Sequence, residues 1–302
     1  MGIISGAASI TRFTVSPVPD EIDFEPIRFE AIPARAEVRE RIGVVPLDPG
    51  APYEAGARRW FFRVRFDTVK PDPTAVQERL KQLIYAELEM TGATGVGPKK
   101  RKRLKQQAEE ELVVDANPRS KIIECCIDGE TLYVGTTANA ALGTIMALLR
   151  QIGLVAAFKT PWIDLGEPDF ESPLIESFEP GASALGCRFL RHLLGERGLM
   201  IEPESGYVKL QAPDARITLS GAVLPELHRY VERGAEVLAA KLLTPTTSFR
   251  LDGLTFRMTG MRVESSRQEH WTETLDERLR MIEETWDLLD QTYARLRDQL
   301  RR

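Results

Sequence analysis

The chain has 302 residues, 43% of them hydrophobic, and a formal net charge of −5 at pH 7. This composition predicts a globular protein with a substantial core and roughly two or three subdomains. The negative net charge excludes a uniformly basic nucleic-acid-binding protein, so a site for a polyanion must come from local clustering of cations. No run reaches the roughly 18 apolar residues of a membrane span, and residues 1–13 lack the features of a secretion signal.

Strands are predicted where β-branched and aromatic residues gather, and helices where apolar residues recur at helical spacing. The predicted strands are 10–15, 58–69, 121–127, 131–136, 206–212, 215–221, 247–253 and 254–265. The predicted helices are 73–90, 139–153 and 225–243, the last with an internal Gly234. Hairpin turns are predicted at Asp128-Gly129, Pro213-Asp214 and Asp252-Gly253. The fold class is therefore α+β, with antiparallel strand pairs and packed helices.

This pattern predicts six parts, with boundaries taken from turns and changes in composition. They are an N-terminal α+β subdomain (1–72), a helical basic tip region (73–120), a hairpin and helix (121–158), a proline-rich linker (159–180), a C-terminal α+β subdomain (181–271) and a heptad helix (272–302).

The segment GATGVGPKKRKRLKQQ, residues 92–107, is the most unusual in the chain. Gly92 and Gly97 have the spacing of a phosphate-binding loop, but Pro98 stands where that loop needs lysine, and no Ser or Thr follows. The preceding segment is a predicted helix, whereas such a loop follows a strand. The glycines are therefore interpreted as a helix stop and a turn.

Six cations follow within seven positions at the predicted start of a helix, and we call them the basic run: Lys99, Lys100, Arg101, Lys102, Arg103 and Lys105. A helix N-terminus disfavours cations by about 0.3–1 kcal/mol per exposed charge, and the six charges also repel one another. A polyanion would relieve both costs. The alternative is a solvated face whose cations pair with Glu109–Glu111 or another acidic segment.

Other cations are weaker candidates for the same surface. Arg119 and Lys121 could extend the basic run. Four more alternate with apolar residues on predicted strands, where the solvent face of an antiparallel sheet is the simpler interpretation: Lys209, Arg216, Arg250 and Arg257.

Enzymatic chemistry has little support in the sequence, which predicts no catalytic residue, no metal site and no cofactor. Cys125 and Cys126 are adjacent and Cys187 is distant, so no metal-ligand spacing occurs and reduced thiols in the cytoplasm are expected. The histidines are equally scattered: His192, His228 and His270. Acidic pairs in the proline-containing linker are weak candidates for a nuclease: Asp164 with Glu167, and Asp169 with Glu171.

The last segment has a heptad pattern, with apolar residues in alternating steps of four and three. These residues are Leu275, Leu279, Ile282, Trp286, Leu289, Tyr293, Leu296 and Leu300, and Thr274 with Glu277 forms a possible capping box. The pattern predicts either a helix that packs on its own domain or with an antiparallel partner, or a parallel coiled coil. Bulky Trp286 and Tyr293 disfavour the parallel coiled coil.

The order of several segments resembles the RdgC family of bacterial recombination-associated proteins. The resemblance covers about residues 35–195, through RAEVRERIGVVPLDPG (35–50), the strand and proline-led helix of 58–89, the basic run with the hairpin and helix that follow it, and ESFEPGASALGCRFLRHLL (176–194). No single motif is diagnostic, and the order of the segments is the basis of the comparison.

The resemblance implies a non-enzymatic protein, associated with the nucleoid, that binds double-stranded DNA without sequence preference. It further implies a ring-shaped homodimer around the duplex that limits the access of a RecA-type recombinase. Two departures stand out. The first departure lies before the strand matched by 121–127, where family members can have an Arg and an aromatic residue but this chain has DANPRS (115–120). The second is the heptad helix, which differs from the family's usual C-terminal end.

A competing interpretation is a structural or adaptor protein. In that case the heptad helix would recruit a partner and the basic run would bind an acidic protein surface or RNA. A nuclease without a cofactor is the third interpretation.

Overall fold

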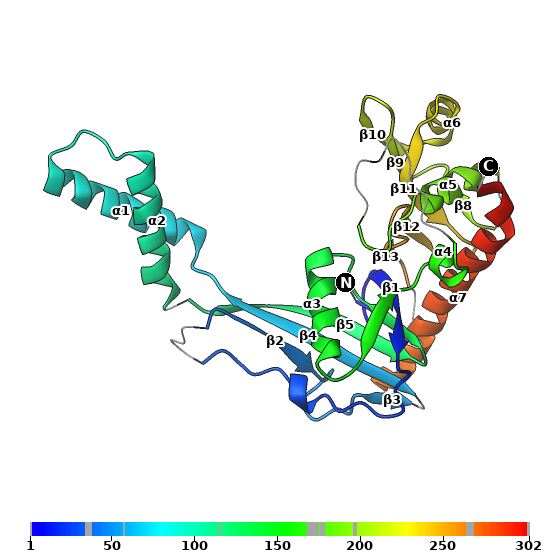
Figure 1. The fold of residues 1–302 in the computed structure, drawn as a ribbon, viewed down its shortest axis with the longest axis horizontal. Coiled ribbons are helices and arrows are strands. Elements are labelled where there is room, and N and C mark those ends of the chain that lie inside the picture. Colours follow the sequence, from blue (N-terminus) through cyan, green and yellow to red (C-terminus); the bar gives the residue numbers. More distant parts are fainter. Residues whose placement is uncertain are drawn as a thin grey trace. The chain divides into compact units, whose positions relative to one another are not determined.

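The computed structural model describes residues 2–33, 38–56, 58–114, 116–167, 175, 179–195, 198–263 and 269–300. It shows an α+β protein with a large antiparallel sheet, packed helices and a long C-terminal helix (Figure 1). The predicted fold class is therefore confirmed at this level. Within the described residues, none of the helices has both the length and the apolar character required to cross a membrane.

Among the described residues, thirteen strands are hydrogen-bonded into the sheet. They are β1 (Ala8–Ser16), β2 (Glu40–Val45), β3 (Glu54–Gly56), β4 (Arg59–Val69), β5 (Pro118–Asp128), β6 (Thr131–Val134), β7 (Val155–Phe158), β8 (Met200–Ile201), β9 (Gly206–Gln211), β10 (Arg216–Gly221), β11 (Glu236–Leu243), β12 (Ser248–Asp252) and β13 (Met258–Met261). The main order is β10-β9-β11-β12-β13-β1-β6-β5-β4-β2, while β3 pairs with β4, β7 with β1 and β8 with β11.

Helices α1 to α6 lie between these strands in the sequence, and α7 follows the last strand. The helices are α1 (Pro73–Thr91), α2 (Pro98–Val113), α3 (Asn139–Arg150), α4 (Pro161–Asp164), α5 (Leu185–His192), α6 (Leu224–Glu232) and α7 (Trp271–Leu300). Short 3-10 helices are η1 (Glu25–Ile27) and η2 (Leu193–Gly195).

The chain divides into two compact units. The larger unit comprises Met1–Asp23, Pro46–Phe62 and Ile123–Arg302, and the smaller unit comprises Phe24–Val45 and Arg63–Ile122. The predicted tip region 73–120 lies within the smaller unit, together with β2 and most of β4. Part of the predicted linker 159–180 is described, and there Trp162 of α4 is buried in the core of the larger unit.

Two of the predicted hairpins pair as their turn residues indicate. Asp128 of β5 lies opposite Thr131 of β6, so Asp128-Gly129 forms the turn. Arg216 of β10 lies opposite Gln211 of β9, around Pro213-Asp214. Local turn chemistry was sufficient for both predictions, because each turn joins strands that are also neighbours in the sheet.

The predicted helix 225–243 is wrong in its second half. Helix α6 ends at Glu232, and Gly234 adopts a left-handed backbone with φ +85° that stops it. The following residues form β11, a central strand that pairs with both β9 and β12. Gly234 is therefore the boundary between a helix and a strand.

The heptad face of α7 packs within its own chain. All eight predicted seam residues are at most 3% exposed. They join one core with α5 and with strands of the larger unit, where Tyr293 lies 5.7 Å from Phe189 and Trp286 lies 6.1 Å from Phe256, measured between ring centroids. This arrangement is the self-packing alternative, and it leaves almost no exposed area of these side chains for a second copy of the chain.

The predicted capping box at the start of this helix is also wrong. The helix begins at Trp271, so Thr274 already lies inside it, and its backbone N–H donates to the carbonyl of His270 at 3.3 Å. Trp271 itself packs against Phe61 with 5.8 Å between ring centroids. The helix therefore starts before the sequence pattern indicated.

Candidate nucleic-acid interface

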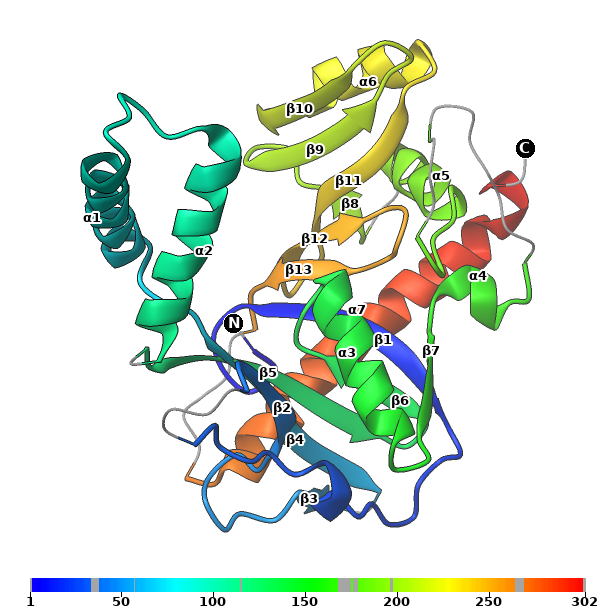
Figure 2. The same cartoon turned by 60° about the vertical axis from the view of Figure 1, so that its left-hand side comes forward.

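Helices α1 and α2 pack against each other as a helical hairpin in the smaller unit (Figures 1 and 2). The carboxylate of Asp72 caps α1 by accepting hydrogen bonds from the backbone N–H groups of Thr74 and Ala75 at 2.8 and 3.1 Å. Buried apolar residues at helical spacing line the facing sides of the two helices: Val76, Leu80, Leu104 and Ala108. The amphipathic pattern of each helix thus forms the hairpin.

The loop between the two helices is a turn and not a phosphate-binding loop. Gly92 ends α1 in a left-handed conformation with φ 64°, and its N–H donates to the carbonyl of Leu88. Pro98 then occupies the first turn of α2 after Gly97. The loop therefore follows a helix, whereas a phosphate-binding loop follows a strand.

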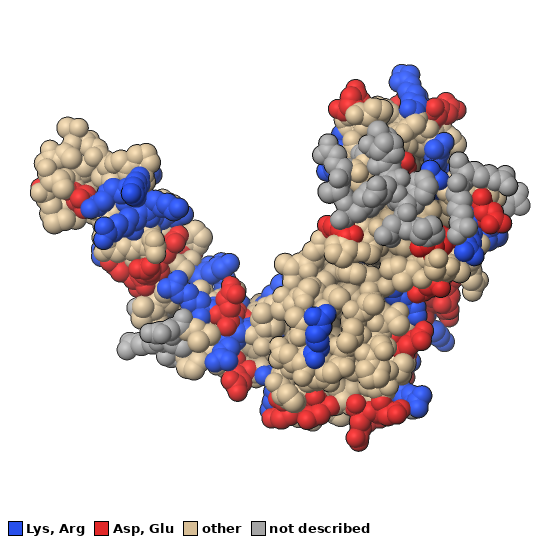
Figure 3. Space-filling model, viewed as in Figure 1, with Lys and Arg blue, Asp and Glu red and all other residues tan. Residues whose placement is uncertain are grey.

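The basic run occupies the first two turns of α2, as predicted. Leu104 is buried on the side of α2 that faces α1. Lys99, Lys102 and Arg103, which are spaced i, i+3 and i+4, share the outward side of the helix and are exposed. Figure 3 shows a group of blue side chains on this hairpin.

Two members of the basic run are paired and four are not. The Nζ of Lys100 lies 3.0 Å from a carboxylate oxygen of Glu87 on α1, and Lys105 lies 3.6 Å from Glu109 on its own helix. Within the part of the chain that the structure describes, the remaining four make no ion pair: Lys99, Arg101, Lys102 and Arg103. These four are the cations with most to gain from an anionic ligand.

The glutamates at the far end of α2 have other partners. Glu111 accepts from Arg79 of α1 at 2.6 Å and from Gln107 at 2.9 Å, and Glu110 accepts from Gln106 at 2.9 Å. Hydrogen bonds from Arg79 and then Gln107 lower the pKa of Glu111. Of the three glutamates, only Glu109 pairs with the basic run in the described contacts, so most of the run is not neutralised by them.

The electrostatics at the start of α2 are unfavourable for the isolated helix. Its first turn has no acidic residue, and its N-cap forms no side-chain hydrogen bond. Free backbone N–H groups and clustered cations therefore lie at the same end of the helix. A shallow depression of about 590 Å³ lies along this end, with Lys99, Lys102, Arg103 and Gln106 among its lining residues.

Arg119 and Lys121 do not extend this group of cations. Both lie near the start of β5, beyond the C-terminal end of α2, while the basic run lies at its N-terminal end. Lys105, the last member of the basic run, still lies about 12 Å along the axis from the end of α2 at Val113. Arg119 lies instead near the start of α1, close to the N-cap residue Asp72. Backbone hydrogen bonds from Ala75 and Thr74 lower the pKa of Asp72, and the nearby charge of Arg119 lowers it further.

The four strand cations belong to the larger unit, and only Arg257 does not lie on the outward face of its sheet. Lys209 and Arg250 alternate with buried residues on β9 and β12, and Arg216 of β10 lies opposite Gln211 of β9. Arg257 is buried, and its guanidinium donates to the carbonyl of Thr137 at 3.1 Å and to the side chain of Asn139. Arg257 therefore has a structural role, as an anchor between two parts of the larger unit.

The acidic residues of the predicted linker form no site in the described residues. Glu167 accepts hydrogen bonds from the hydroxyl of Tyr293 at 2.7 Å and from Arg297 at 2.6 Å, which fastens it to α7. Burial raises the pKa of Asp164. Asp169 and Glu171 lie outside the described residues. In the described ranges, no group of three or more His, Cys, Asp or Glu residues is arranged to hold a metal ion.

The three cysteines are buried and free. Burial raises the pKa of each thiol above its ordinary value. A buried, protonated thiol is a poor nucleophile.

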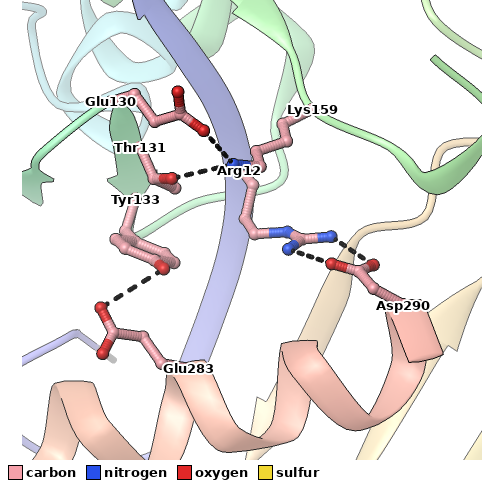
Figure 4. Close-up of polar contacts among 7 residues, drawn as sticks. All are labelled: Arg12, Glu130, Thr131, Tyr133, Lys159, Glu283 and Asp290. Carbon is pink, nitrogen blue, oxygen red and sulfur yellow. Dashed lines mark hydrogen bonds and ion pairs between the residues drawn. The ribbon is translucent and has the colours of Figure 1, made fainter. Parts of the chain in front are cut away.

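A buried polar network was missed by the sequence analysis (Figure 4). Arg12 of β1 is only 5% exposed and forms an ion pair with Asp290 of α7, while the hydroxyl of Tyr133 on β6 donates to Glu283 of α7 at 3.5 Å. Lys159 bridges Glu130 and Thr131. The only sequence signal was a single cation, Arg12, inside the apolar run 10–15.

Comparison of the chain with models of known protein families and with curated proteins gives no match.

Proposed function

We propose that this protein binds double-stranded DNA without sequence preference, through the outward face of the N-terminal half of α2. The main support is that Lys99, Lys102 and Arg103 share one exposed face and make no ion pair with described residues. Cations on a helix N-terminus bind phosphates with both their side chains and the free backbone N–H groups.

The absence of sequence preference follows from the chemistry of this face. Lysine and arginine on an exposed helix end contact phosphate oxygens, which are the same for every base pair. Reading a base edge requires side chains that enter a groove at fixed positions, such as a bidentate Arg held by its neighbours. The three outward cations have no such support in the described structure, so the proposed role is affinity alone.

The wider role that we propose comes from the resemblance to the RdgC family. A protein that covers duplex DNA would limit the access of a RecA-type recombinase, without catalysis and in the cytoplasm at the nucleoid. We also propose a homodimer, ring-shaped as the resemblance implies. Because the seam of α7 is buried within its own chain, the dimer contact would use another surface.

Only one of the two features behind the adaptor hypothesis, the basic run, remains available to a partner. That hypothesis relied on the heptad seam to recruit a partner, and those eight side chains are at most 3% exposed. The basic run remains available for RNA or for an acidic protein surface, because those ligands would also relieve its charge. A comparison of duplex DNA, duplex RNA and an acidic peptide separates these alternatives.

The proposal is tested by salt-dependent binding of a fluorescent DNA duplex. Each neutralised phosphate contributes about 0.9 to the slope of log affinity against log salt. The triple variant Lys99→Gln, Lys102→Gln and Arg103→Gln should lower this slope by about 3 for two duplexes of unrelated sequence. A charge-matched control replaces three exposed arginines that have carboxylate partners: Arg28→Gln, Arg229→Gln and Arg280→Gln.

Equal slopes for the folded triple variant and the wild type would overturn the proposed interface. An equal loss in the control variant would show a general charge effect in place of a defined site. A strand-exchange reaction with a RecA-type recombinase then tests the wider role, since only the wild type and the control variant should inhibit it.

A further inference from the structure

The larger unit has a sheet face that the described helices leave uncovered. One face of β9, β11 and β12 packs into the core with α5, and its side chains are buried: Val208, Leu210, Val237, Ala240, Leu242, Phe249 and Leu251. Successive side chains in a strand point to opposite faces. The other face therefore presents Tyr207, Lys209, Lys241 and Arg250, which are partly or fully exposed. Figure 2 shows β9, β11 and β12 with α5 to their right.

Two cations on this face lie directly opposite each other on neighbouring strands. Lys241 of β11 is in register with Arg250 of β12, and Arg250 is in register with Thr259 of β13. Like charges at directly opposite positions destabilise a sheet. Lys241 pairs with Glu202, with 3.9 Å between the charged atoms, whereas Arg250 makes no ion pair among the described residues.

Arg250 is instead stacked on an aromatic ring. Its guanidinium carbon lies 4.2 Å from the centre of the Tyr207 ring on β9. This contact holds the planar guanidinium over the sheet without neutralising its charge. The Nζ of Lys241 is also held in place, because it donates to the carbonyl and hydroxyl oxygens of Ser205 at 3.1 and 2.7 Å. Both cations are thus positioned, and Arg250 has no anionic partner among the described residues.

A hollow of about 820 Å³ lies over these residues. Arg262 adds a further cation to the lining and Glu204 adds one carboxylate, while hydroxyl groups come from Ser9, Ser205, Ser220, Ser248 and Thr259. Gly260 belongs to the lining too, with φ +66°, a conformation that favours glycine, and it has no side chain to fill the space. The hollow is therefore open, and its lining has three cations against one carboxylate.

We propose that this face binds a single strand of RNA. Arg250, Lys241 and Arg262 would contact phosphates, and the Tyr207–Arg250 stack offers a flat surface on which an unpaired base can lie. A sheet face suits a single strand, because reading a duplex requires an element that enters a groove. The hydroxyl-rich lining favours RNA over DNA, since the 2′-hydroxyl is both a hydrogen-bond donor and an acceptor.

This site is independent of the duplex-binding proposal, because all of its residues lie in the larger unit and the basic run lies in the smaller one. The test is fluorescence polarisation with a labelled oligouridylate of about twelve nucleotides, which is within the usual range of site sizes. The matched oligodeoxyuridylate differs from it only in the 2′-hydroxyl. Each oligonucleotide is titrated with the full-length protein at several salt concentrations.

Wild type should bind the RNA more tightly than the DNA. Tyr207→Ala should weaken RNA binding about tenfold through lost stacking. Arg250→Gln should weaken it and lower the salt slope by about 0.7, the value for one phosphate of a single strand. The control Arg229→Gln removes an exposed cation of α6 and should change neither quantity. The triple variant of the basic run should bind the oligouridylate as the wild type does.

Several results would overturn the proposal. Wild type that fails to bind the oligouridylate at low salt would exclude the site. Folded Tyr207→Ala and Arg250→Gln variants with wild-type affinity would exclude this face. DNA binding as tight as RNA binding would exclude the assignment to RNA. A basic-run variant that loses duplex binding but still binds the oligouridylate would leave the RNA proposal intact, because the result bears only on the duplex-binding proposal.

Discussion

The guanidinium of Arg12 donates two hydrogen bonds to the carboxylate of Asp290, each 2.8 Å long. The same guanidinium lies 4.0 Å from the centre of the Trp286 ring. The side chain of Arg12 is 4% exposed and that of Asp290 is 30% exposed, so the pair lies at the border of the core. It fastens the central strand β1 to α7 by a planar, two-bonded contact.

Removing Asp290 should destabilise the protein more than removing a nearby exposed acid. Asp290→Ala leaves the buried cation of Arg12 without its partner, which should lower the free energy of unfolding by about 2–4 kcal/mol. Urea denaturation followed by circular dichroism measures this change. Asp287→Ala, an exposed position on the same helix, is the control. Similar midpoints for the two variants would show that the Arg12 contact contributes little.

The stability should also depend on pH through Glu283. Burial, and then the charge of Asp128, raise the pKa of Glu283 from 4.5 to about 7 in the folded protein. The folded state therefore binds this proton more tightly than the unfolded state, so stability is lost as the pH rises from about 4.5 to about 7.

Glu283→Gln cannot ionise and should remove this loss. At pH 8 the variant should be more stable than the wild type by roughly 1–3 kcal/mol, and the difference should shrink towards pH 4. Thermal and urea unfolding across this range, with the exposed Glu284→Gln as control, measure the effect. A constant difference at all pH values would contradict the assignment to ionisation of Glu283.

The buried seam of α7 predicts how a seam substitution behaves. Leu279 is 0% exposed, so Leu279→Ala should lower the free energy of unfolding by about 2–5 kcal/mol. Its molar mass by light scattering, over a concentration series, should match that of the wild type. If the seam were instead a contact between chains, the variant would dissociate on dilution. Arg280→Ala, at the exposed neighbouring position, should leave both stability and mass unchanged.

The basic run should be slightly costly to the free protein. Replacing Lys99, Lys102 and Arg103 with Gln removes three cations from a helix N-terminus, which should raise the free energy of unfolding by about 1 kcal/mol at low salt. The gain should fall at 1 M salt, where the screening length is about 3 Å. Thermal unfolding at both salt concentrations measures it. A destabilised variant would show that these side chains have structural partners.

Local sequence signals were sufficient where an element depends on near neighbours. The β5–β6 hairpin follows from Asp128-Gly129, and the ends of α1 follow from Asp72 and Gly92. Local sequence signals failed for residues 236–243, whose run of Val, Leu and Ala is equally suited to a helix. That segment is a strand because β9 and β12 lie on both sides of it, a tertiary preference that outweighs local propensity.

The candidate sites, like the secondary structure, were predictable from the sequence only in part. The clustering of cations on α2 was visible in the sequence, but their pairing was not, because Lys100 finds Glu87 only through the packing of α2 on α1. Arg12 is separated from Asp290 by 278 positions, so no local pattern connects them. The strand cations Lys209 and Arg250 were weak candidates for the nucleic-acid surface, but the register that sets Lys241 against Arg250 was not predictable, because it depends on strand pairing.

The burial of all three native thiols makes the chain suitable for site-specific labelling. Cys125, Cys126 and Cys187 are inaccessible to a maleimide dye while the protein is folded. A cysteine introduced at Gly95, in the exposed loop between α1 and α2 where an added Cβ meets no other atom, would be the single reactive thiol. A fluorophore at that position would report directly on whether DNA approaches this end of the helical hairpin.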